Sequence, residues 1–212
     1  MDDTSVSKQS PELEKVRRHV RILVDLGRAA GEAADLNRFL DQAVVQVARA
    51  VEINHVKVLR YRRREADLLV AAGFGWREGV VRSATLPADL RSPPGRSFQT
   101  AEPVFIRNLD EQEDFTVSDL LRQHHIVSLV NVPVLIAGAA WGVLEIDSTS
   151  PRDFSQDTIE FLTAAAALIA HSCSPALPSR ARLRESRLPP WRRRTATCCF
   201  VKCSIVSRTA FS

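Results

Sequence analysis

The sequence predicts an α+β domain in which helices flank a central antiparallel β-sheet of about six strands, followed by a disordered C-terminal tail. Two observations predict the sheet: strand-like apolar runs come in neighbouring pairs, and no regular strand–helix–strand alternation connects them. A third marks the end of the domain, because sustained periodicity stops after Cys173 and arginine, serine and proline become frequent. We therefore divide the chain into a disordered N-terminus (1–11), a folded domain (12–173) and a basic, disordered tail (174–212).

Two helices are expected before the first strand. In the first, over Leu13–Ala34, apolar or small residues recur at alternating spacings of three and four: Leu13, Val16, Val20, Leu23, Gly27, Ala30 and Ala34. This heptad pattern fits a dimerising signalling helix and equally a helix packed on its own domain. Leu36–Val51 is the second helix, with one apolar stripe and Asp35 at its N-cap position.

Three apolar runs predict the first half of the sheet. His55–Arg62 alternates valines with charged residues, and Asp67–Gly75 is the next run, so the basic residues between them form a solvated hairpin loop. Val80–Leu86 is expected to be a third strand. Leu86–Gly95 holds three prolines and a glycine, which predicts a loop.

Short elements fill the middle of the chain. We expect a short helix at Arg96–Ala101 and a short strand at Pro103–Ile106. An acidic loop follows at Arg107–Phe115, and Val117–His125 is a second short helix.

Residues 128–172 are the most informative stretch. Ser128–Ile136 and Trp141–Asp147 are apolar runs joined by small residues, which predicts a hairpin. Pro133 lacks the backbone N–H of a sheet ladder, so it requires an edge strand or an outward-facing position. The last helix begins after Ser155, which we expect to be its N-cap, and presents one apolar stripe.

From about residue 20 to 172 these segments resemble the GAF family. The first hairpin and Gly95–Ile106 carry part of the resemblance, and the strongest part is SLVNVPV at 128–134 with WGVLEI at 141–146 and Pro151–Ser155. More narrowly, GFGWREG, SPPGRSFQTAEPV, LLRQHHIVSLVNVPV and WGVLEIDSTSPRDF are similar to N-terminal GAF domains of bacterial sensor histidine kinases.

The resemblance implies a GAF or PAS-like fold with a pocket beneath the short helices, and a small-molecule-sensing role as the input of a two-component sensor kinase. The pocket candidates combine apolar walls with few polar groups, as small-molecule sites do: Phe98, Phe105, Phe115, Leu120, His124, Asn131 and Glu145. Each could instead be a core or sheet-face residue. The ligand would shift the terminal helices, through which we expect a homodimer.

Cysteine positions restrict the cofactor, which stays unknown. The four cysteines are Cys173, Cys198, Cys199 and Cys203, all at or beyond the end of the last helix. Some GAF domains attach a bilin through a cysteine, and others reduce free methionine sulfoxide through cysteines, so the sequence disfavours a covalent bilin and this reductase activity. We expect no catalytic residue, no metal site and no kinase activity, because a phosphoacceptor helix and an ATP-binding domain do not fit after residue 172.

Cyclic-nucleotide binding is also disfavoured. Asn108, Phe115 and Asp119 partly match the signature of GAF domains that bind cyclic nucleotides, but Leu109 and Leu120 stand where that signature has lysine and glutamate.

Charge is spread unevenly along the chain. The formal net charge is +4, yet the tail after Cys173 alone carries about +8, which leaves about −4 for residues 1–173. No run approaches the roughly 20 apolar residues of a membrane helix, and the polar N-terminus does not resemble a signal peptide. We expect a cytoplasmic protein without a nucleic-acid or membrane partner. The alternatives are nucleic-acid or anionic-membrane binding through the arginine-rich tail, and a module that serves only for dimerisation.

Overall fold

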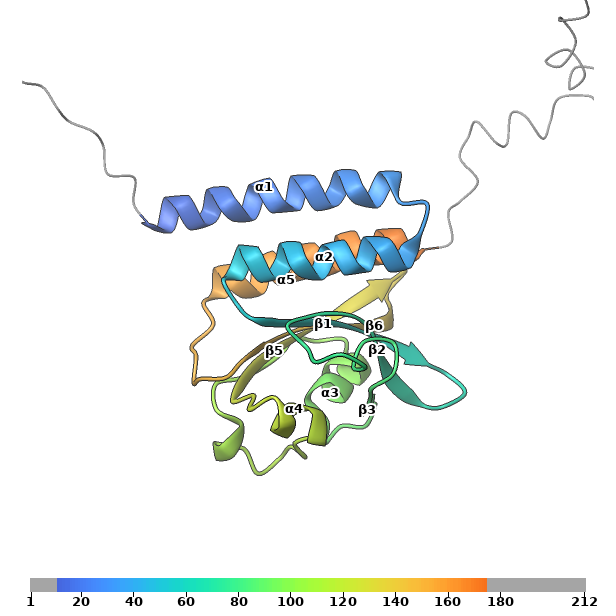
Figure 1. Cartoon of the computed structure of the whole chain (residues 1–212), viewed down its shortest axis with the longest axis vertical. Helices are drawn as coiled ribbons and strands as arrows, with labels where there is room; N and C mark the ends of the chain where they lie inside the picture. Colours follow the sequence, from blue (N-terminus) through green and yellow to red (C-terminus); the bar gives the residue numbers. More distant parts are fainter. Residues whose placement is uncertain (1–10, 175–212) are drawn as a thin grey trace, which may run out of the picture. The chain divides into compact units, whose positions relative to one another are not determined.

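The computed structural model describes residues 11–174, in which helices cover both faces of one β-sheet (Figure 1). Along the chain the elements are α1 (Pro11–Glu32), α2 (Leu36–Val51), β1 (His55–Arg62), β2 (Asp67–Phe74), β3 (Thr85–Pro87), α3 (Pro93–Thr100), β4 (Val104–Ile106), the 3₁₀ turn η1 (Leu109–Glu111), α4 (Asp119–Gln123), β5 (Ser128–Ile136), β6 (Ala139–Ser148) and α5 (Gln156–Cys173). No helix among these residues is long and apolar enough to cross a membrane. The basic tail and its predicted disorder lie outside the described residues.

The sheet has six strands in the order β3-β2-β1-β6-β5-β4, and all neighbours are antiparallel. This confirms the predicted antiparallel sheet of an α+β domain. The central pair is β1 and β6, which joins the two hairpins of the sheet although their residues lie far apart in the sequence. As a result, the middle of the sheet is assembled from both halves of the chain.

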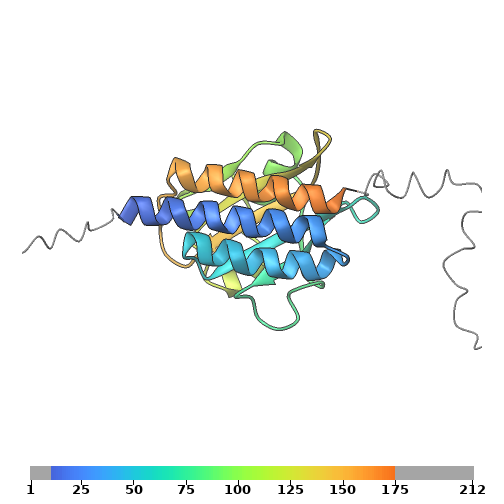
Figure 2. The same cartoon turned by 90° about the horizontal axis from the view of Figure 1, so that it is seen from above.

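The two faces of the sheet have different chemistry. Because side chains alternate along a strand, Val56 and Val58 of β1 point to one face and Lys57 to the other. The first face is apolar and packs against α2 and α5. Helix α1 lies on the outer side of these two helices and runs alongside them (Figures 1 and 2). The second face, which carries Lys57, is covered by α3, α4 and the loop after β2. The sheet thus separates a large apolar core on its first face from buried polar groups on its second face.

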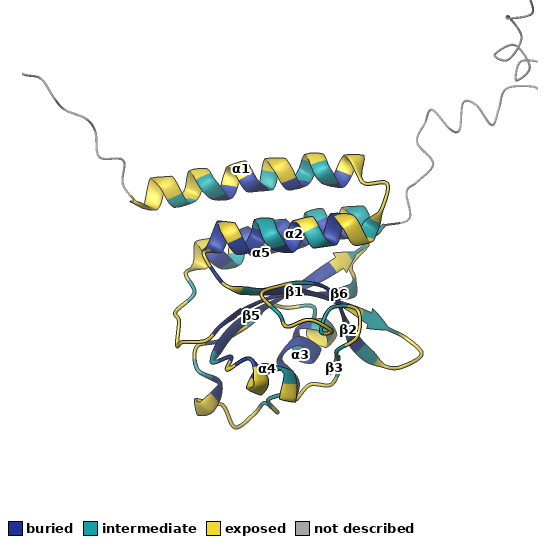
Figure 3. Cartoon of the chain, in the orientation of Figure 1, coloured by how far each residue is buried: buried dark blue, intermediate teal, exposed yellow. Residues whose placement is uncertain are grey.

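Helix α1 packs on its own domain, but through a different stripe from the predicted heptad. Its buried residues are His19, Ile22, Leu26 and Ala30. Of the predicted stripe, Leu13, Val16 and Val20 remain 44%, 45% and 56% exposed, as does Val24 at 57% (Figure 3). The first part of the predicted stripe therefore faces away from the domain, whereas Leu23 and Ala30 of its later part pack against the core.

Two local predictions are wrong. Residues 80–84 form turns rather than a strand, and only Thr85–Pro87 pairs with β2. Helix α3 begins at Pro93 inside the predicted loop, since proline suits the first positions of a helix, where an N–H would have no intrahelical partner. The second error comes from reading prolines as loop signals alone.

The β5–β6 hairpin agrees with the sequence. Its turn is Ala137–Gly138, and both residues have positive φ (50° and 82°), which suits the tight turns that join antiparallel strands. Strand β4 pairs with β5 only at Leu129–Asn131, so Pro133 lies beyond the stretch that needs a ladder on that side. Ser155 stands at the N-cap of α5 as predicted, but its side chain makes no capping hydrogen bond and instead meets Thr158 and Lys15.

Candidate functional site

Four polar side chains without any solvent exposure lie on the second face of the sheet, and we call them the polar cluster: Lys57, Asn131, Glu145 and Asp147. The Nζ of Lys57 donates a hydrogen bond to Asp147 Oδ2 at 2.8 Å and lies 2.9 Å from Glu145 Oε1. Charged residues are almost never fully buried unless they are paired. A buried lysine between two buried carboxyl groups is therefore the most unusual feature of the domain.

Strand register brings these residues together. Lys57 of β1 lies opposite Glu145 of β6, and Glu145 lies opposite Asn131 of β5. Directly opposed residues in an antiparallel pair have their Cβ atoms about 4.5–5.5 Å apart and point to the same face. Asp147, two residues along β6, lies opposite His55. The cluster is thus built across three central strands.

Three aromatic rings adjoin the polar cluster: those of His55, Trp76 and His124. The Trp76 ring is 5.1 Å from the His55 ring and 4.7 Å from the His124 ring, and Lys57 Nζ lies 4.3 Å from the Trp76 ring centroid. Trp76 Nε1 donates a hydrogen bond to the carbonyl of Val56 at 2.9 Å, so it fastens the loop after β2 to the sheet.

A second bond holds the same loop against α4. The backbone N–H of Arg77 donates to His124 Nε2 at 3.3 Å, which leaves His124 Nδ1 as the donor to the carbonyl of Leu120 at 2.9 Å. His124 is therefore the neutral Nδ1–H tautomer, because a protonated ring would have no acceptor nitrogen.

Burial sets the protonation state of Glu145. Loss of solvation raises the pKa of Glu145 well above its ordinary value, and the neighbouring charge of Asp147 raises it further, whereas Lys57 opposes this. Burial also lowers the pKa of His55. Burial thus favours the protonated, uncharged form of Glu145 beside the Lys57–Asp147 pair.

Several atoms of the cluster have no hydrogen-bond partner within the described residues. They are both amide atoms of Asn131, both oxygens of Glu145, Asp147 Oδ1 and His55 Nδ1. Glu145 is nevertheless close to charged partners: its Oε1 lies 2.9 Å from Lys57 Nζ, and interactions with the side chains of both Lys57 and Asp147 shift its pKa. An unpaired buried polar group costs about 1–3 kcal/mol, so such a concentration indicates groups that serve a bound molecule or ordered water.

Apolar clusters lie on both sides of the polar cluster. One contains Leu59, Leu68 and Val143 with Phe98 and Leu120 packed against it; the Phe98 ring stacks on Tyr61 at 4.4 Å. The other centres on residues of β4, α4 and β5, with Phe115 and Trp76 against it: Ile106, Leu109, Leu121, Ile126 and Leu129. The polar groups therefore sit between apolar walls.

Six of the seven predicted pocket residues belong to this side of the sheet. Asn131, Glu145 and His124 gather in or beside the polar cluster, while Phe98, Leu120 and Phe115 lie in the apolar walls. Phe105 does not join them. Val104 lies opposite Asn131, and the next residue of the strand, Phe105, points to the other face, where it lies opposite Val130. Its side chain is 65% exposed there.

The sequence reasoning missed Lys57, Asp147, His55 and Trp76. The sequence predicts Lys57 only as a charged residue that alternates with valines in a strand, and valines on both sides of it are also typical of a strand buried on both faces. Asp147 and Glu145 stand two residues apart in an otherwise apolar strand, and this spacing places both on one face. That pair of acids is the signal that could have found the cluster.

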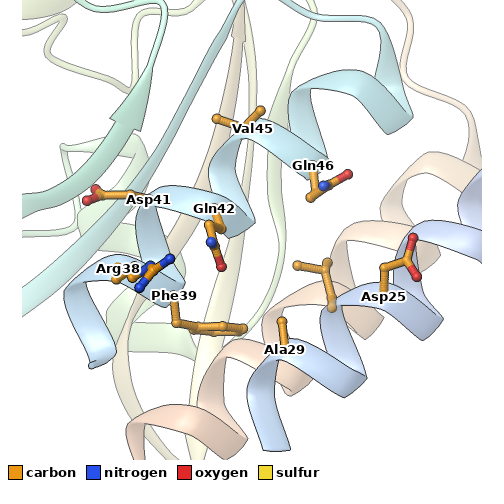
Figure 4. Close-up of a pocket in the computed structure, with 9 residues that line it drawn as sticks. Asp25, Ala29, Arg38, Phe39, Asp41, Gln42, Val45 and Gln46 are labelled. Carbon is orange, nitrogen blue, oxygen red and sulfur yellow. The ribbon is translucent and has the colours of Figure 1, made fainter. Parts of the chain in front are cut away.

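Among the cavities of the described residues, one lies away from the polar cluster and another reaches its edge. One of about 470 Å³ is lined by Asp25, Leu26 and Ala29 of α1 and by residues of α2 that include Phe39 (Figure 4), and Asp41 at this site is already paired with Arg82 at 2.6 Å. A polar cavity of about 180 Å³ is lined by the ends of β1 and β6, where it meets His55 and Asp147. Among residues 11–174, no group of three His, Cys, Asp or Glu side chains is arranged to hold a metal ion.

Known proteins resemble this chain in sequence. The chain is 27% identical over 156 residues to the Nif-specific regulatory proteins of Azospirillum lipoferum and Azospirillum brasilense; the match covers 69% of the chain and 24% of each relative. The chain thus spans about a quarter of the length of the relatives it matches.

Solved structures extend the likeness to the fold. The GAF domain of a phosphoenolpyruvate-protein phosphotransferase from Acinetobacter superposes with a TM-score of 0.65 at 22% identity, covering 79% of this chain and 97% of that one. Free methionine-R-sulfoxide reductase from Neisseria meningitidis superposes with a TM-score of 0.63 at 17% identity, over 79% and 91% of the two chains. The family model of the GAF domain matches residues 35–173. The chain belongs to the GAF domain family.

Proposed function

We propose that this GAF domain, a sensory and regulatory module, binds a small molecule at the polar cluster and passes the signal on through its helices. The observation that carries the proposal is the set of fully buried polar groups without partners, above all Asn131 and Glu145, between two apolar walls. Small-molecule sites combine apolar walls with a few convergent polar groups and with residues of perturbed pKa.

The sheet offers a short route from this site to the helices. Lys57 belongs to the polar cluster, while its neighbours Val56 and Val58 belong to the apolar core under α2 and α5. A ligand that repositions β1, β5 or β6 would therefore change the packing of α2 and α5, and of α1 above them. Helix α1 lies before the residues that match the family model, and α5 forms the end of the matched region. Both helices are therefore suited to pass a change in packing to further domains.

The host of such a module is a multidomain regulator. The sequence resemblance favours the input domain of a sensor histidine kinase. The Nif-specific regulatory proteins, of which the chain covers 24%, favour the input domain of a regulatory protein of that kind. In either case the domain would act in the cytoplasm, beside its output. We assign no thiolate chemistry to Cys173, at the end of α5, because burial raises the pKa of its thiol to about 12.

Native mass spectrometry of the purified chain, followed by thermal-shift screening with small metabolites, tests the proposal. We expect a co-purified or added molecule to raise the melting temperature, and Asn131→Leu to abolish that rise without unfolding the domain. A chain that carries no molecule and whose melting temperature no metabolite changes would contradict the sensing role.

A further inference from the structure

A groove between α1 and α2 lies on the first side of the sheet, away from the polar cluster. Its main cavity has a volume of about 470 Å³, and a cavity of about 290 Å³ adjoins it near the turn between the two helices. The cavities share the lining residues Ala29, Arg38, Phe39 and Gln42, so they are parts of one groove. Small-molecule sites have volumes of about 300–1,000 Å³, so the groove is large enough for a ligand.

The groove exists because α1 ends in small residues. Residues 29–36 read AAGEAADL, so the last turn of α1 and the residues after it present little side-chain volume to α2. Ala29, Ala33 and Ala34 line the groove, whereas Ala30 is buried in the core. Protein interiors are otherwise closely packed. A bound molecule would therefore occupy space that the side chains of the domain leave open.

The base of the groove is apolar. Leu26 of α1 and Phe39 of α2 belong to the apolar core and also line the main cavity, together with Val45. The Phe39 ring points from α2 toward Ala29 of α1 (Figure 4). Aromatic rings in contact gain more than the burial of their area alone. The base therefore favours a ligand with an aromatic ring.

Two glutamine amides line the same cavity. Gln42 and Gln46 are four residues apart, which places them on one side of α2. Neither side chain has a hydrogen-bond partner among residues 11–174. Each amide offers donors and an acceptor. A ligand that carries a donor and an acceptor side by side, as a carboxamide does, can form two hydrogen bonds with such an amide.

The charges around the main cavity cancel. Asp25 and Asp41 contribute two negative charges, and two positive charges come from Arg38 and from Arg82, which pairs with Asp41 at 2.6 Å. An ionised ligand would lose hydration on entering the apolar part of the groove without meeting a net opposite charge. The main cavity therefore suits an uncharged ligand.

Two further acids line the smaller cavity at the end of the groove. Asp35 is the N-cap of α2 and accepts hydrogen bonds from the backbone N–H groups of Asn37 and Arg38, and Glu32 is exposed. These acids would attract a cation, so the experiment below includes a cationic probe.

We propose that the groove between α1 and α2 is a second small-molecule site, which takes an uncharged aromatic molecule with a carboxamide or a similar donor–acceptor group. The ring packs on Leu26 and Phe39, and the amide group pairs with Gln42 or Gln46. Because such a ligand contacts both helices, it holds α1 against α2.

Three probes of similar size that differ in their polar group test the ligand class: benzamide, benzoate and benzylammonium. Amide chemical shifts of the full, ¹⁵N-labelled chain locate each probe. With benzamide we expect saturable shifts in residues 25–46, at least about fivefold tighter than with either ion, because the ions lose more hydration. Acetophenone, which keeps the ring and the acceptor but has no N–H donor, should also bind more weakly than benzamide.

Substitutions in the groove test its position. Ala29→Phe fills the groove and should abolish the shifts, whereas Ala167→Phe, exposed on α5, should leave them unchanged. Gln42→Leu with Gln46→Leu leaves α1 unaltered and should weaken benzamide binding about fivefold, because two amide partners are lost. Gln123→Leu, exposed at the end of α4, is its control. Benzamide should also slow hydrogen exchange of α1 amides in the wild type.

Each failure has its own signature. Tighter binding of benzoate or benzylammonium would overturn the ligand class, and unchanged benzamide affinity in the double glutamine variant would overturn the role of the amides. Shifts centred on Asn131 and Trp76 would place the probe at the polar cluster, which overturns this second site and leaves the proposed function intact. Absence of saturable shifts with all four probes would likewise overturn the second site, while the thermal-shift screen decides the proposed function independently.

Discussion

The ammonium group of Lys57 and the carboxylate of Asp147 form an ion pair at 2.8 Å across the two central strands, and neither side chain is exposed to solvent. Taking two charges out of water is costly, and hydrophobic residues of similar volume are often as stable or more so. A pair of this kind is thus weak evidence for stability, and its place beside unpartnered polar groups connects it instead with a binding site. The predictions below follow from this arrangement and from the packing of the helices.

Removing Lys57 should destabilise the domain strongly. Lys57→Met leaves the Asp147 carboxylate buried without its partner, and breaking a buried pair in this way costs about 3–5 kcal/mol. Urea denaturation followed by circular dichroism measures the free energy of unfolding. Arg62→Met is the control from the same strand, because the Arg62–Asp67 pair is partly exposed and should contribute at most about 1 kcal/mol. Equal effects of the two substitutions would show that burial of Lys57 has no energetic consequence.

Glu145→Gln should stabilise the ligand-free domain, increasingly so as the pH rises. Below the ordinary pKa of 4.5, the carboxyl group is protonated in the folded and unfolded chains alike. Above it, the unfolded chain ionises while burial keeps Glu145 protonated in the fold, so the wild type loses about 1.4 kcal/mol per pH unit until the raised pKa is reached. Denaturation curves at pH 4.5, 6 and 7.5 measure the difference, with Glu160→Gln as control. A stability difference independent of pH would mean that Glu145 is ionised in the fold.

Acidification should loosen α1 through His19. This residue is buried in α1, its ring stacks on Phe161 at 4.3 Å, and its Nε2 has no partner. Burial lowers the pKa of His19, and the nearby charges of Lys15 and Arg18 lower it further. The hydrogen bond with the backbone of Ala50 and, more weakly, the charge of Asp157 raise this pKa but do not reverse the shift.

Because its folded-state pKa lies below the unfolded value of 6.5, the unfolded chain takes up the proton first, and stability falls as the pH falls through that range. His55 adds a loss of the same sign. Hydrogen exchange of α1 amides at pH 7.5 and 5.5 should show faster opening at the lower pH, and His19→Gln should reduce that difference. His171→Gln, exposed on α5, should leave it unchanged. Equal opening free energies at both pH values, after correction for the intrinsic exchange rates, would contradict the role of His19.

Gly75→Ala should release the loop that carries Trp76. Gly75 has φ of 82°, and a Cβ there would lie 1.7 Å from the carbonyl oxygen of Asn54, so backbone must move. Gly79→Ala is the matched control in the same loop, with φ of 85° but open space around the added carbon. The control should lose about 1–2 kcal/mol of stability, which is the cost of holding a residue with a Cβ in a left-handed conformation. We expect a larger loss in Gly75→Ala, together with red-shifted Trp76 emission; equal losses would show that the contact with Asn54 is relieved without cost.

The exposed stripe of α1 should form a homodimer. Leu13, Val16, Val20 and Val24 are spaced for one side of a helix and are 44–57% exposed. Light scattering at increasing concentration should reveal a dimer in the wild type and a monomer in Val16→Ser with Val20→Ser. Asp25→Ser, on the same helix but outside the stripe, is the control. A wild-type chain that is monomeric at every concentration would contradict this prediction.

The amino-acid sequence by itself determined the class of fold and most of its elements. The bounds of α2, β1 and β5 agree with the apolar patterns, because each pattern has the period of its element and continues to its ends. Local sequence also identified Asn131 and Glu145 as polar residues among apolar ones. It failed where one residue type serves two purposes, as with the prolines that begin α3.

Tertiary structure decided the rest. Lys57 and Asp147 lie 90 residues apart, and only the pairing of β1 with β6 brings their side chains to 2.8 Å. The heptad in α1 was visible in the sequence, but the side that packs inward depends on where α2 and α5 lie. The same alternation that sends Lys57 and Glu145 into the polar cluster sends Phe105 to the opposite face, since the face on which a strand residue lies depends on register with strands far away in the chain.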